Sequence, residues 1–514
     1  MTELLKNFVS GQWQAGTGAG TLLKDPVTGE ALVRVDAGDL DLAAAFAYAR
    51  EVGGTALRAI TYRERAAMLG AIGKVLRANR EAYYDIATAN SGTTRNDSAV
   101  DIDGAIYTVG TYTKLGDGLG ERMYLLDGEP QWLSKESIFQ SQHVLVPTRG
   151  VALFINAFNF PAWGLWEKAA PALLSGVPVI VKPATSTAWL TQRMVLDVVD
   201  AGILPKGALS IVCGSSAGLL DQLAPFDVVS FTGSADTGAL VRSHHAVTRR
   251  SVRANIEADS VNSALLLPGE AQGSEAFDLL VREVAREMTV KSGQKCTAVR
   301  RVFVPAEAYD AAAAAISAKL AKIVVGNPRH DSVRMGALVS RAQLDAVQSG
   351  LALLREQTDV LHDGAGHELV DADPNVACCI GPTLLGTRTP DQAPRIHEME
   401  VFGPVATLVP YRDLEHGLSM IRAGEGSLVA SLYGSDMAAL ANTAIALADS
   451  HGRVHTVSPD VGSVHTGHGN VMPQSLHGGP GRAGGGEELG GLRALNLYHR
   501  RSAIQASAAM GDHI

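Results

Sequence analysis

One cysteine stands in a setting that suits covalent chemistry. Cys296 lies in a loop of small and amide-bearing residues, 293–298, directly after a predicted helix at 277–289. A thiolate adds to an aldehyde carbonyl, and the resulting thiohemiacetal oxyanion needs hydrogen-bond donors. A lone cysteine is more often a structural thiol, so this chemistry depends on the groups that the fold brings to Cys296.

Two other side chains have the right types to serve that reaction. Asn159 follows a predicted strand and precedes Phe160-Pro161, where its amide would donate to the oxyanion. The alternative is a turn asparagine before a helix start. Glu257 ends the run 253–256, and a carboxylate there would activate water, provided that its pKa is near neutral. The alternative is a solvated glutamate.

Two strand-to-helix turns suit a dinucleotide. Lys182 ends the strand-like run 177–181, where its ammonium would bond ribose hydroxyls or phosphate, or would simply be solvated. The segment 231–238 also follows a strand and opens a helix, and its Gly233, Ser234 and Gly238 permit close backbone approach to phosphate. Its spacing differs from G-x-G-x-x-G, so a plain strand–turn–helix junction explains it almost as well.

The elements that position these residues alternate between strands and helices. Short apolar runs at 151–155, 177–181, 209–212 and 228–231 are separated by helical patterns such as 163–174 and 187–201. The same alternation recurs after Cys296, with a strand at 302–304 and helices at 309–322 and 340–355. This pattern predicts an α/β protein with two doubly wound parallel sheets.

Composition excludes several functional classes. The 514 residues carry a net charge of −9, which argues against general nucleic-acid affinity. The four cysteines have neither disulfide-framework nor zinc-motif spacing, so we expect a reducing compartment, the cytoplasm, and no metal. The N-terminal residues lack a basic, apolar leader, and we find no apolar run of about 18 residues, so we expect no signal peptide and no membrane span.

Taken together, these residues resemble the aldehyde dehydrogenase superfamily over nearly the full chain. The motifs that carry the resemblance are Asn159-Phe160-Pro161, Lys182-Pro183, Phe231-Thr232-Gly233-Ser234, Glu257, Gly293-Gln294-Lys295-Cys296 and Glu400-Val401-Phe402-Gly403-Pro404. The resemblance implies an NAD(P)-binding domain at 1–129 and 150–262 and a catalytic domain at 263–494. It also implies an oligomerisation β-ribbon and tail at 130–149 and 495–514, and hence a homodimer or homotetramer.

The resemblance also implies roles for individual residues. Cys296 is then the nucleophile, Asn159 the oxyanion donor and Glu257 the base. Lys168 and Glu488 match the family's proton relay, and Glu400 and Phe402 its nicotinamide-ribose site. The remaining cofactor residues are Lys182, Thr185, Gly233, Ser234 and Gly238. NAD-preferring members often carry glutamate where this chain has Thr185, which favours NADP over NAD.

A closer resemblance within the family concerns the substrate. The segment 256–262 and the glycine-rich tail 477–491 resemble the enzymes that oxidise 3,4-dehydroadipyl-CoA semialdehyde in aerobic benzoyl-CoA degradation. They also resemble the dehydrogenase half of the bifunctional phenylacetate ring-cleavage enzyme, but we find no hydratase-like second half. The expected partner is therefore a small aldehyde, CoA-linked. The alternatives are a CoA-acylating dehydrogenase, which generally lacks the base at Glu257, and a non-catalytic binding protein on the same fold.

Overall fold

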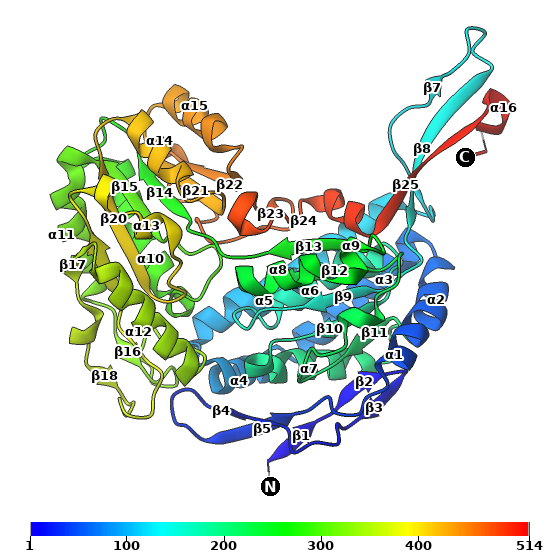
Figure 1. Ribbon diagram of the computed structural model, residues 1–514, viewed down its shortest axis with the longest axis horizontal. Coiled ribbons are helices and arrows are strands. Elements are labelled where there is room, and N and C mark those ends of the chain that lie inside the picture. The colour runs from blue at the N-terminus through cyan, green and yellow to red at the C-terminus, as the bar shows by residue number, and fades with distance from the viewer. Residues whose placement is uncertain (1, 512) are drawn as a thin grey trace.

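A computed structural model describes residues 2–511 and 513–514 as two α/β domains and a projecting β-ribbon (Figure 1). The first sheet has the strand order β13-β12-β9-β10-β11-β2-β3. These strands are β13 (Arg253–Glu257), β12 (Val228–Thr232), β9 (Ala152–Ile155), β10 (Val179–Lys182), β11 (Leu209–Ile211), β2 (Asn7–Val9) and β3 (Gln12–Gln14). The five strands from β13 to β11 are parallel, as the sequence predicted, and β2 and β3 extend the edge in antiparallel fashion.

Helices cover this first sheet and bury its apolar residues. They include α3 (Tyr62–Ala78), α5 (Arg95–Leu119), α6 (Trp163–Leu174) and α7 (Ala188–Asp200). Every residue of α6 is buried, because the helix lies between the sheet and α5. A charged pair within so apolar a helix, Glu167-Lys168, therefore needs partners inside the protein.

The second sheet has the order β17-β19-β20-β15-β14-β21-β22 and is parallel except at β17. Its strands are β17 (Asp359–His362), β19 (Thr383–Gly386), β20 (Val405–Tyr411), β15 (Arg301–Pro305), β14 (Ser263–Leu266), β21 (Ser427–Tyr433) and β22 (His451–Val457). Helices α10 (Glu275–Thr289), α11 (Tyr309–Leu320) and α12 (Arg341–Arg355) accompany it. The predicted fold class, with two doubly wound sheets, is therefore confirmed.

The chain changes sheets between Glu257, which ends β13, and Ser263, which begins β14. The boundary that we propose at residue 262 falls in this connection. The C-terminal stretch then returns to the first domain through β23 (Leu476–Gly478) and β24 (Glu487–Leu489), and Leu489 and Leu495 pack in the first domain's core. This return brings the glycine-rich tail to the end of β13.

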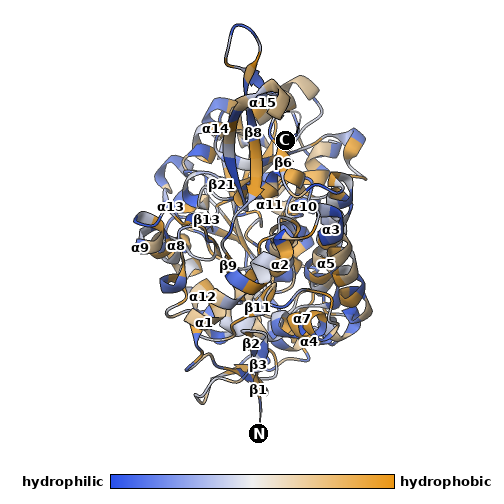
Figure 2. Ribbon diagram, turned by 90° about the vertical axis from the view of Figure 1, so that its right-hand side faces the viewer, coloured by the Kyte–Doolittle hydropathy of each residue, from blue (hydrophilic) through white to orange (hydrophobic). Residues whose placement is uncertain are grey.

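The ribbon projects beyond both domains (Figure 1). Its strand β8 (Phe139–Pro147) pairs antiparallel with β25 (His499–Ser507) over their full lengths. Large apolar side chains on and beside it are at least 40% exposed, namely Leu126, Trp132, Leu133, Ile138, Phe139 and Met510. Figure 2 shows apolar colour along the end of β8 that carries the arrowhead. In the described part of the chain, no helix combines the length and apolar character needed to cross a bilayer.

One buried carboxylate should matter strongly for stability. Asp227 is 0% exposed, accepts hydrogen bonds from the N–H groups of Val151 (2.8 Å) and Ala224 (2.7 Å), and pairs with Arg50 at 2.5 Å. Asp227→Ala leaves all three donors without their acceptor, so we expect the free energy of unfolding of this domain to fall by about 3–5 kcal/mol. Chemical denaturation, followed by fluorescence, measures the change.

The matched control is Asp310→Ala, which removes a carboxylate from a solvent-exposed pair with Arg388. Exposed pairs contribute little, so its denaturation midpoint should stay within error of the wild type. Equal midpoints for the two variants would contradict a structural role for Asp227.

Candidate active site

The loop that carries Cys296 is held in an unusual backbone conformation. After α10 the chain makes a short turn, Val290–Gly293, in which Lys291 and Ser292 both have φ of 53°. Non-glycine residues adopt such angles at a cost of about 1–3 kcal/mol and only where the surroundings enforce them. Here the Ser292 hydroxyl donates to Gly336 O at 3.0 Å, and a Cβ on Gly293 would lie 2.2 Å from Gly403 O. The loop therefore presents Cys296 in one defined place.

Buried side chains tie down the carbonyls around Cys296. Asn262 Nδ2 donates to Cys296 O at 2.7 Å and to Ala298 O at 3.0 Å. Arg300 donates to Gly293 O and Lys295 O at 3.0 and 3.1 Å. Sequence reasoning missed both residues, because nothing in the local pattern indicates that their side chains reach this loop.

Two cavities meet at Cys296. One, of about 290 Å³, is lined mainly by apolar side chains of α5, of the start of α6 and the turn before it, and of the loop 469–473. Among them are Val100, Phe160, Trp163, Val471 and Met472. The other, of about 490 Å³, lies at the carboxyl ends of β9, β10 and β12, where doubly wound sheets bind ligands. Cys296 lines both, so a group in one cavity and a group in the other would meet at its sulfur.

Three of the predicted catalytic residues come together here. Asn159, Glu257 and Cys296 line the second cavity and also a smaller pocket beside it. Burial, followed by the nearby charge and hydrogen bonding of Glu257, raises the pKa of the Cys296 thiol well above its usual value. The thiol is thus protonated in this arrangement, and it must lose this proton to solvent or to a neighbouring group before it attacks a carbonyl carbon.

Glu257 has a partner that sequence reasoning missed. His477 Nε2 lies 2.9 Å from Glu257 Oε2, and the side chains are 2% and 4% exposed. Burial alone would raise the pKa of Glu257, but the charge and hydrogen bond of His477, with Lys168, lower it to about 2. We expected a near-neutral pKa, and the imidazolium ion is the physical reason for the difference. His477 opens the glycine-rich tail that the sequence singled out.

The predicted relay residues lie behind Glu257. Lys168 Nζ is 2.5 Å from Glu167 and 3.1 Å from Glu488, and all three are buried. Ser230 and Asn255 donate to Glu488 at 2.6 and 2.8 Å. Glu167, which sequence reasoning also missed, has its pKa raised to about 8 by burial and by Glu488, against the opposing charge of Lys168.

The residues proposed for the cofactor line the second cavity, with one exception. Lys182, Thr185, Gly233, Ser234, Glu400 and Phe402 are all part of its wall. Gly238 is not part of that wall. It lies inside α8 (Ala235–Ser243), where a Cβ would approach Ile256 Cγ2 to 3.0 Å, so it permits helix–strand packing.

The wall of this cavity fits a dinucleotide. Lys182 is only 9% exposed, and among the described residues no carboxylate pairs with it, so its ammonium suits an anionic or hydroxyl-bearing ligand. Burial lowers the pKa of Lys182. Glu400 accepts from Ser260 N–H at 3.0 Å, and burial raises its pKa to about 7 against the opposing charge of Arg300.

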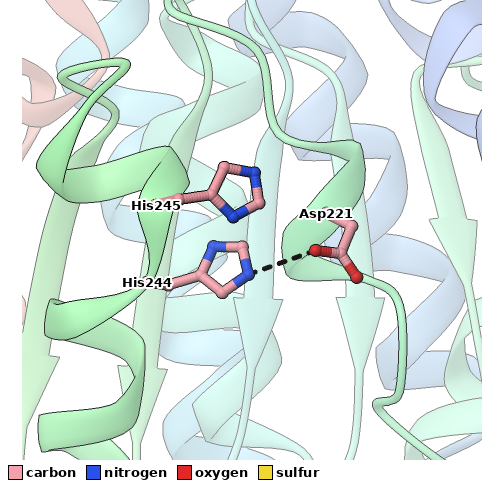
Figure 3. A group of neighbouring side chains, drawn as sticks. All are labelled: Asp221, His244 and His245. Carbon is pink, nitrogen blue, oxygen red and sulfur yellow. Dashed lines mark ion pairs between the residues drawn. The ribbon is translucent and has the colours of Figure 1, made fainter.

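A separate group of titratable side chains lies on the surface of the first domain (Figure 3). His244 Nε2 lies 3.3 Å from Asp221 Oδ1, and His245 is next to it. His244 Nδ1 accepts the N–H of Ala246 at 3.3 Å, so the hydrogen of the neutral ring sits on Nε2 and points to Asp221. Both ring nitrogens of His244 thus have a partner within the protein, the N–H of Ala246 and the carboxylate of Asp221, and we assign no metal to this group.

Comparison with known proteins matches the site to a family. The model of the aldehyde dehydrogenase family matches residues 13–503. A relative, the 3,4-dehydroadipyl-CoA semialdehyde dehydrogenase of Aromatoleum evansii, is 57% identical over 509 residues, which are 99% of this chain and 96% of the relative.

Solved structures share the fold. Lactaldehyde dehydrogenase from Escherichia coli superposes with a TM-score of 0.85 at 22% identity, covering 98% of this chain and 99% of that one. Betaine aldehyde dehydrogenase from Staphylococcus aureus, in complex with NAD+, superposes with a TM-score of 0.84 at 22% identity, covering 98% and 94%. These similarities show that this chain shares its fold with them over nearly its whole length.

Proposed function

Since the chain belongs to the aldehyde dehydrogenase family and oxidises aldehydes with NAD(P), we propose that its substrate is a CoA-linked semialdehyde from aromatic degradation. The proposed substrate is 3,4-dehydroadipyl-CoA semialdehyde, and the proposed cofactor is NADP. The observation that carries the substrate is the 57% identity over 99% of this chain to an enzyme of that name. The apolar cavity at Cys296 supports it, because an extended acyl chain with an aldehyde end fits such a lining.

We propose that the oxidation is covalent. The Cys296 thiolate adds to the aldehyde carbon, and the Asn159 amide with the Cys296 N–H stabilises the oxyanion. NADP, when bound, would supply the hydride acceptor. The thiohemiacetal carbon on Cys296 loses its hydrogen with both electrons as the carbonyl reforms, and a thioester remains on Cys296. Lys182, Thr185, Gly233 and Ser234 would hold its adenosine and phosphate groups.

Hydrolysis of the thioester is the part that Glu257 serves. Its carboxylate is buried, with Oε2 2.9 Å from His477 Nε2, and in the described part of the chain Oε1 has no hydrogen-bond partner, so Oε1 has lone pairs for a water molecule. We propose that Glu257 takes a proton from this water and that Lys168 and Glu488 pass it on. Glu400 and Phe402 would hold the nicotinamide ribose from the opposite domain.

We also propose a homodimer or homotetramer in the cytoplasm. The exposed apolar side chains of the ribbon, such as Trp132, Ile138 and Phe139, would be covered by a second copy of the chain. The described cysteines are free thiols, which suits a reducing compartment.

Cofactor choice provides a prediction at Thr185. A glutamate here would face the 2′-phosphate of NADP with like charge, whereas the Thr185 hydroxyl, which makes only a long bond of 3.3 Å to Gly214 O, can turn to donate. Losing one charge-assisted bond costs about 1.5–3 kcal/mol, or roughly one to two decades in affinity. We expect Thr185→Glu to raise KM for NADP by about 10- to 100-fold and to change KM for NAD little. Thr185→Ser is the matched control and should keep the wild-type ratio.

The substrate is tested by a kinetic panel. We expect kcat/KM for the CoA-linked semialdehyde to exceed that for the same semialdehyde without CoA and for a simple linear aldehyde. Free CoA should not be needed, since water resolves the thioester. A requirement for free CoA would instead identify an acylating dehydrogenase, and equal kcat/KM values across the panel would contradict the proposed substrate.

A further inference from the structure

His477 contacts Glu257 and also lines the apolar cavity at Cys296. It lines the smaller pocket together with Glu257 and Asn159. Its ring stands 5.2 Å from that of Trp163, which holds it in place. It therefore lies where a proton from the reaction would arrive.

We propose that Glu257 and His477 act as one base that shares a single proton, which is held on His477 in the resting enzyme. This proposal rests on the function proposed above. The ion pair of 2.9 Å, buried on both sides, is the observation that carries it. With the proton on His477, the carboxylate is neutralised by an adjacent positive charge and accepts a second proton poorly. Once that proton is lost, the pair has a net negative charge and accepts a proton readily.

The groups around His477 favour this arrangement. The titratable side chains that act on it or pack against it are Glu257 at the end of β13, Cys296 in its loop, Glu167 and Lys168 on α6, and Glu488, its register partner on β24. Burial would lower the pKa of His477, but Glu257, then Glu167 and Glu488, outweigh it and raise the pKa to about 9. Within the pair, the imidazole is thus the member that titrates at alkaline pH, next to Glu167, whose pKa burial raises to about 8.

The hydrolytic step then balances as follows. Water adds its oxygen to the thioester carbon while one of its hydrogens moves to the deprotonated pair. The carbon–sulfur bond breaks with its electrons going to Cys296 Sγ, and the free carboxylic acid forms. The proton on the pair returns to the sulfur or passes toward Lys168 and Glu488, so the enzyme is regenerated without any other reactant.

The test is the pH profile of the hydrolytic step in His477→Gln, followed as kcat after the burst of NADPH. For the wild type, the rate should rise with pH through a midpoint near 9, because loss of the His477 proton activates the pair. In His477→Gln, Glu257 titrates without a partner. No imidazolium remains to offset the effects of burial and of the neighbouring Glu167, which both raise the pKa of Glu257. The midpoint should move to lower pH by about two units, and the alkaline plateau should fall by about 10- to 100-fold.

The control is His416→Gln, which removes another imidazole 2.9 Å from a carboxylate, that of Asp391, far from Cys296. It should keep the wild-type profile. An unchanged midpoint in His477→Gln, with a normal burst, would overturn the proposal and leave Glu257 as the sole base. Absence of aldehyde-dependent NADPH formation by the wild type would instead contradict the proposed function on which this inference rests.

A second variant guards against misfolding of the first. In Glu257→Gln the imidazole loses its carboxylate, so the slow residual hydrolysis should show no rise through a midpoint near 9. A residual rate that keeps the wild-type midpoint would show that the titration does not depend on Glu257, which contradicts a proton shared by the pair.

Discussion

Replacing Cys296 by alanine is expected to abolish aldehyde oxidation, with kcat falling on the order of 10⁶-fold, as in other enzymes that lose a covalent nucleophile. The physical reason is that Cys296 alone lines both cavities through which aldehyde and cofactor would approach each other. No other thiol lies there among the described residues. The measurement is NADPH absorbance with enzyme at high concentration, so that a residual rate is visible.

The other three cysteines are matched controls. Cys213 and Cys378 are buried and Cys379 is half-buried, and none of them lines either cavity at Cys296. Alanine at each position should leave kcat within about threefold of the wild type, with small losses of stability from packing. Robust turnover by Cys296→Ala would contradict the covalent mechanism.

Replacing Glu257 by glutamine is expected to separate the two halves of the reaction. If Glu257 serves mainly the hydrolysis of the thioester, the first turnover should still release one equivalent of NADPH as a burst. Steady-state turnover should then fall by about 10²–10⁴-fold, the usual contribution of a general base. Rapid-mixing absorbance resolves both phases in one experiment.

The control for this variant is Glu270→Gln, a buried glutamate that accepts from Ser435 N–H at 2.7 Å in the second domain. It should keep both phases. Loss of the burst in Glu257→Gln, together with the steady state, would place Glu257 before hydride transfer, as the group that takes the proton of Cys296. Burial, and after it the charge and hydrogen bond of Glu257, raise the pKa of the Cys296 thiol, and the nearness of the two groups is the physical basis of this second outcome.

Much of the fold could be predicted from the sequence because its signals are local. Helix α6 was predicted with the bounds that the structure has, since its apolar residues are bounded by Pro161 at one end and Gly176 at the other. The bounds of the strand that ends at Lys182 were predicted within one or two residues, because four apolar residues come shortly before Lys182 in the sequence. Such signals also placed Lys182 at the carboxyl end of a parallel strand.

The electrostatics of the site could not be predicted in the same way. His477 lies far from Glu257 in the chain, and only the return of β23 and β24 to the first domain brings them to 2.9 Å. The low pKa of Glu257 follows from that contact and not from any motif. Glu167 had a weaker local signal, as a carboxylate inside an apolar helix, but its neighbour Glu488 is again distant in sequence.

Gly238 shows that a local sequence signal can also predict a ligand contact that the fold does not make. Its place after a strand suggested contact with phosphate, but one helical turn carries it away from the cavity and against Ile256. A glycine required for packing and a glycine required for a ligand have the same sequence pattern here. Only the position of neighbouring side chains distinguishes them.

The covalent thioester on Cys296 is the central claim, and mass spectrometry tests it most directly. Glu257→Gln would be mixed with a linear aldehyde and NADP, quenched in acid during the slow phase, and measured as intact protein and as peptides. The account predicts one added acyl group per chain, located on Cys296 and absent when NADP is omitted. Unmodified Cys296 in a sample that has released its burst of NADPH would contradict it.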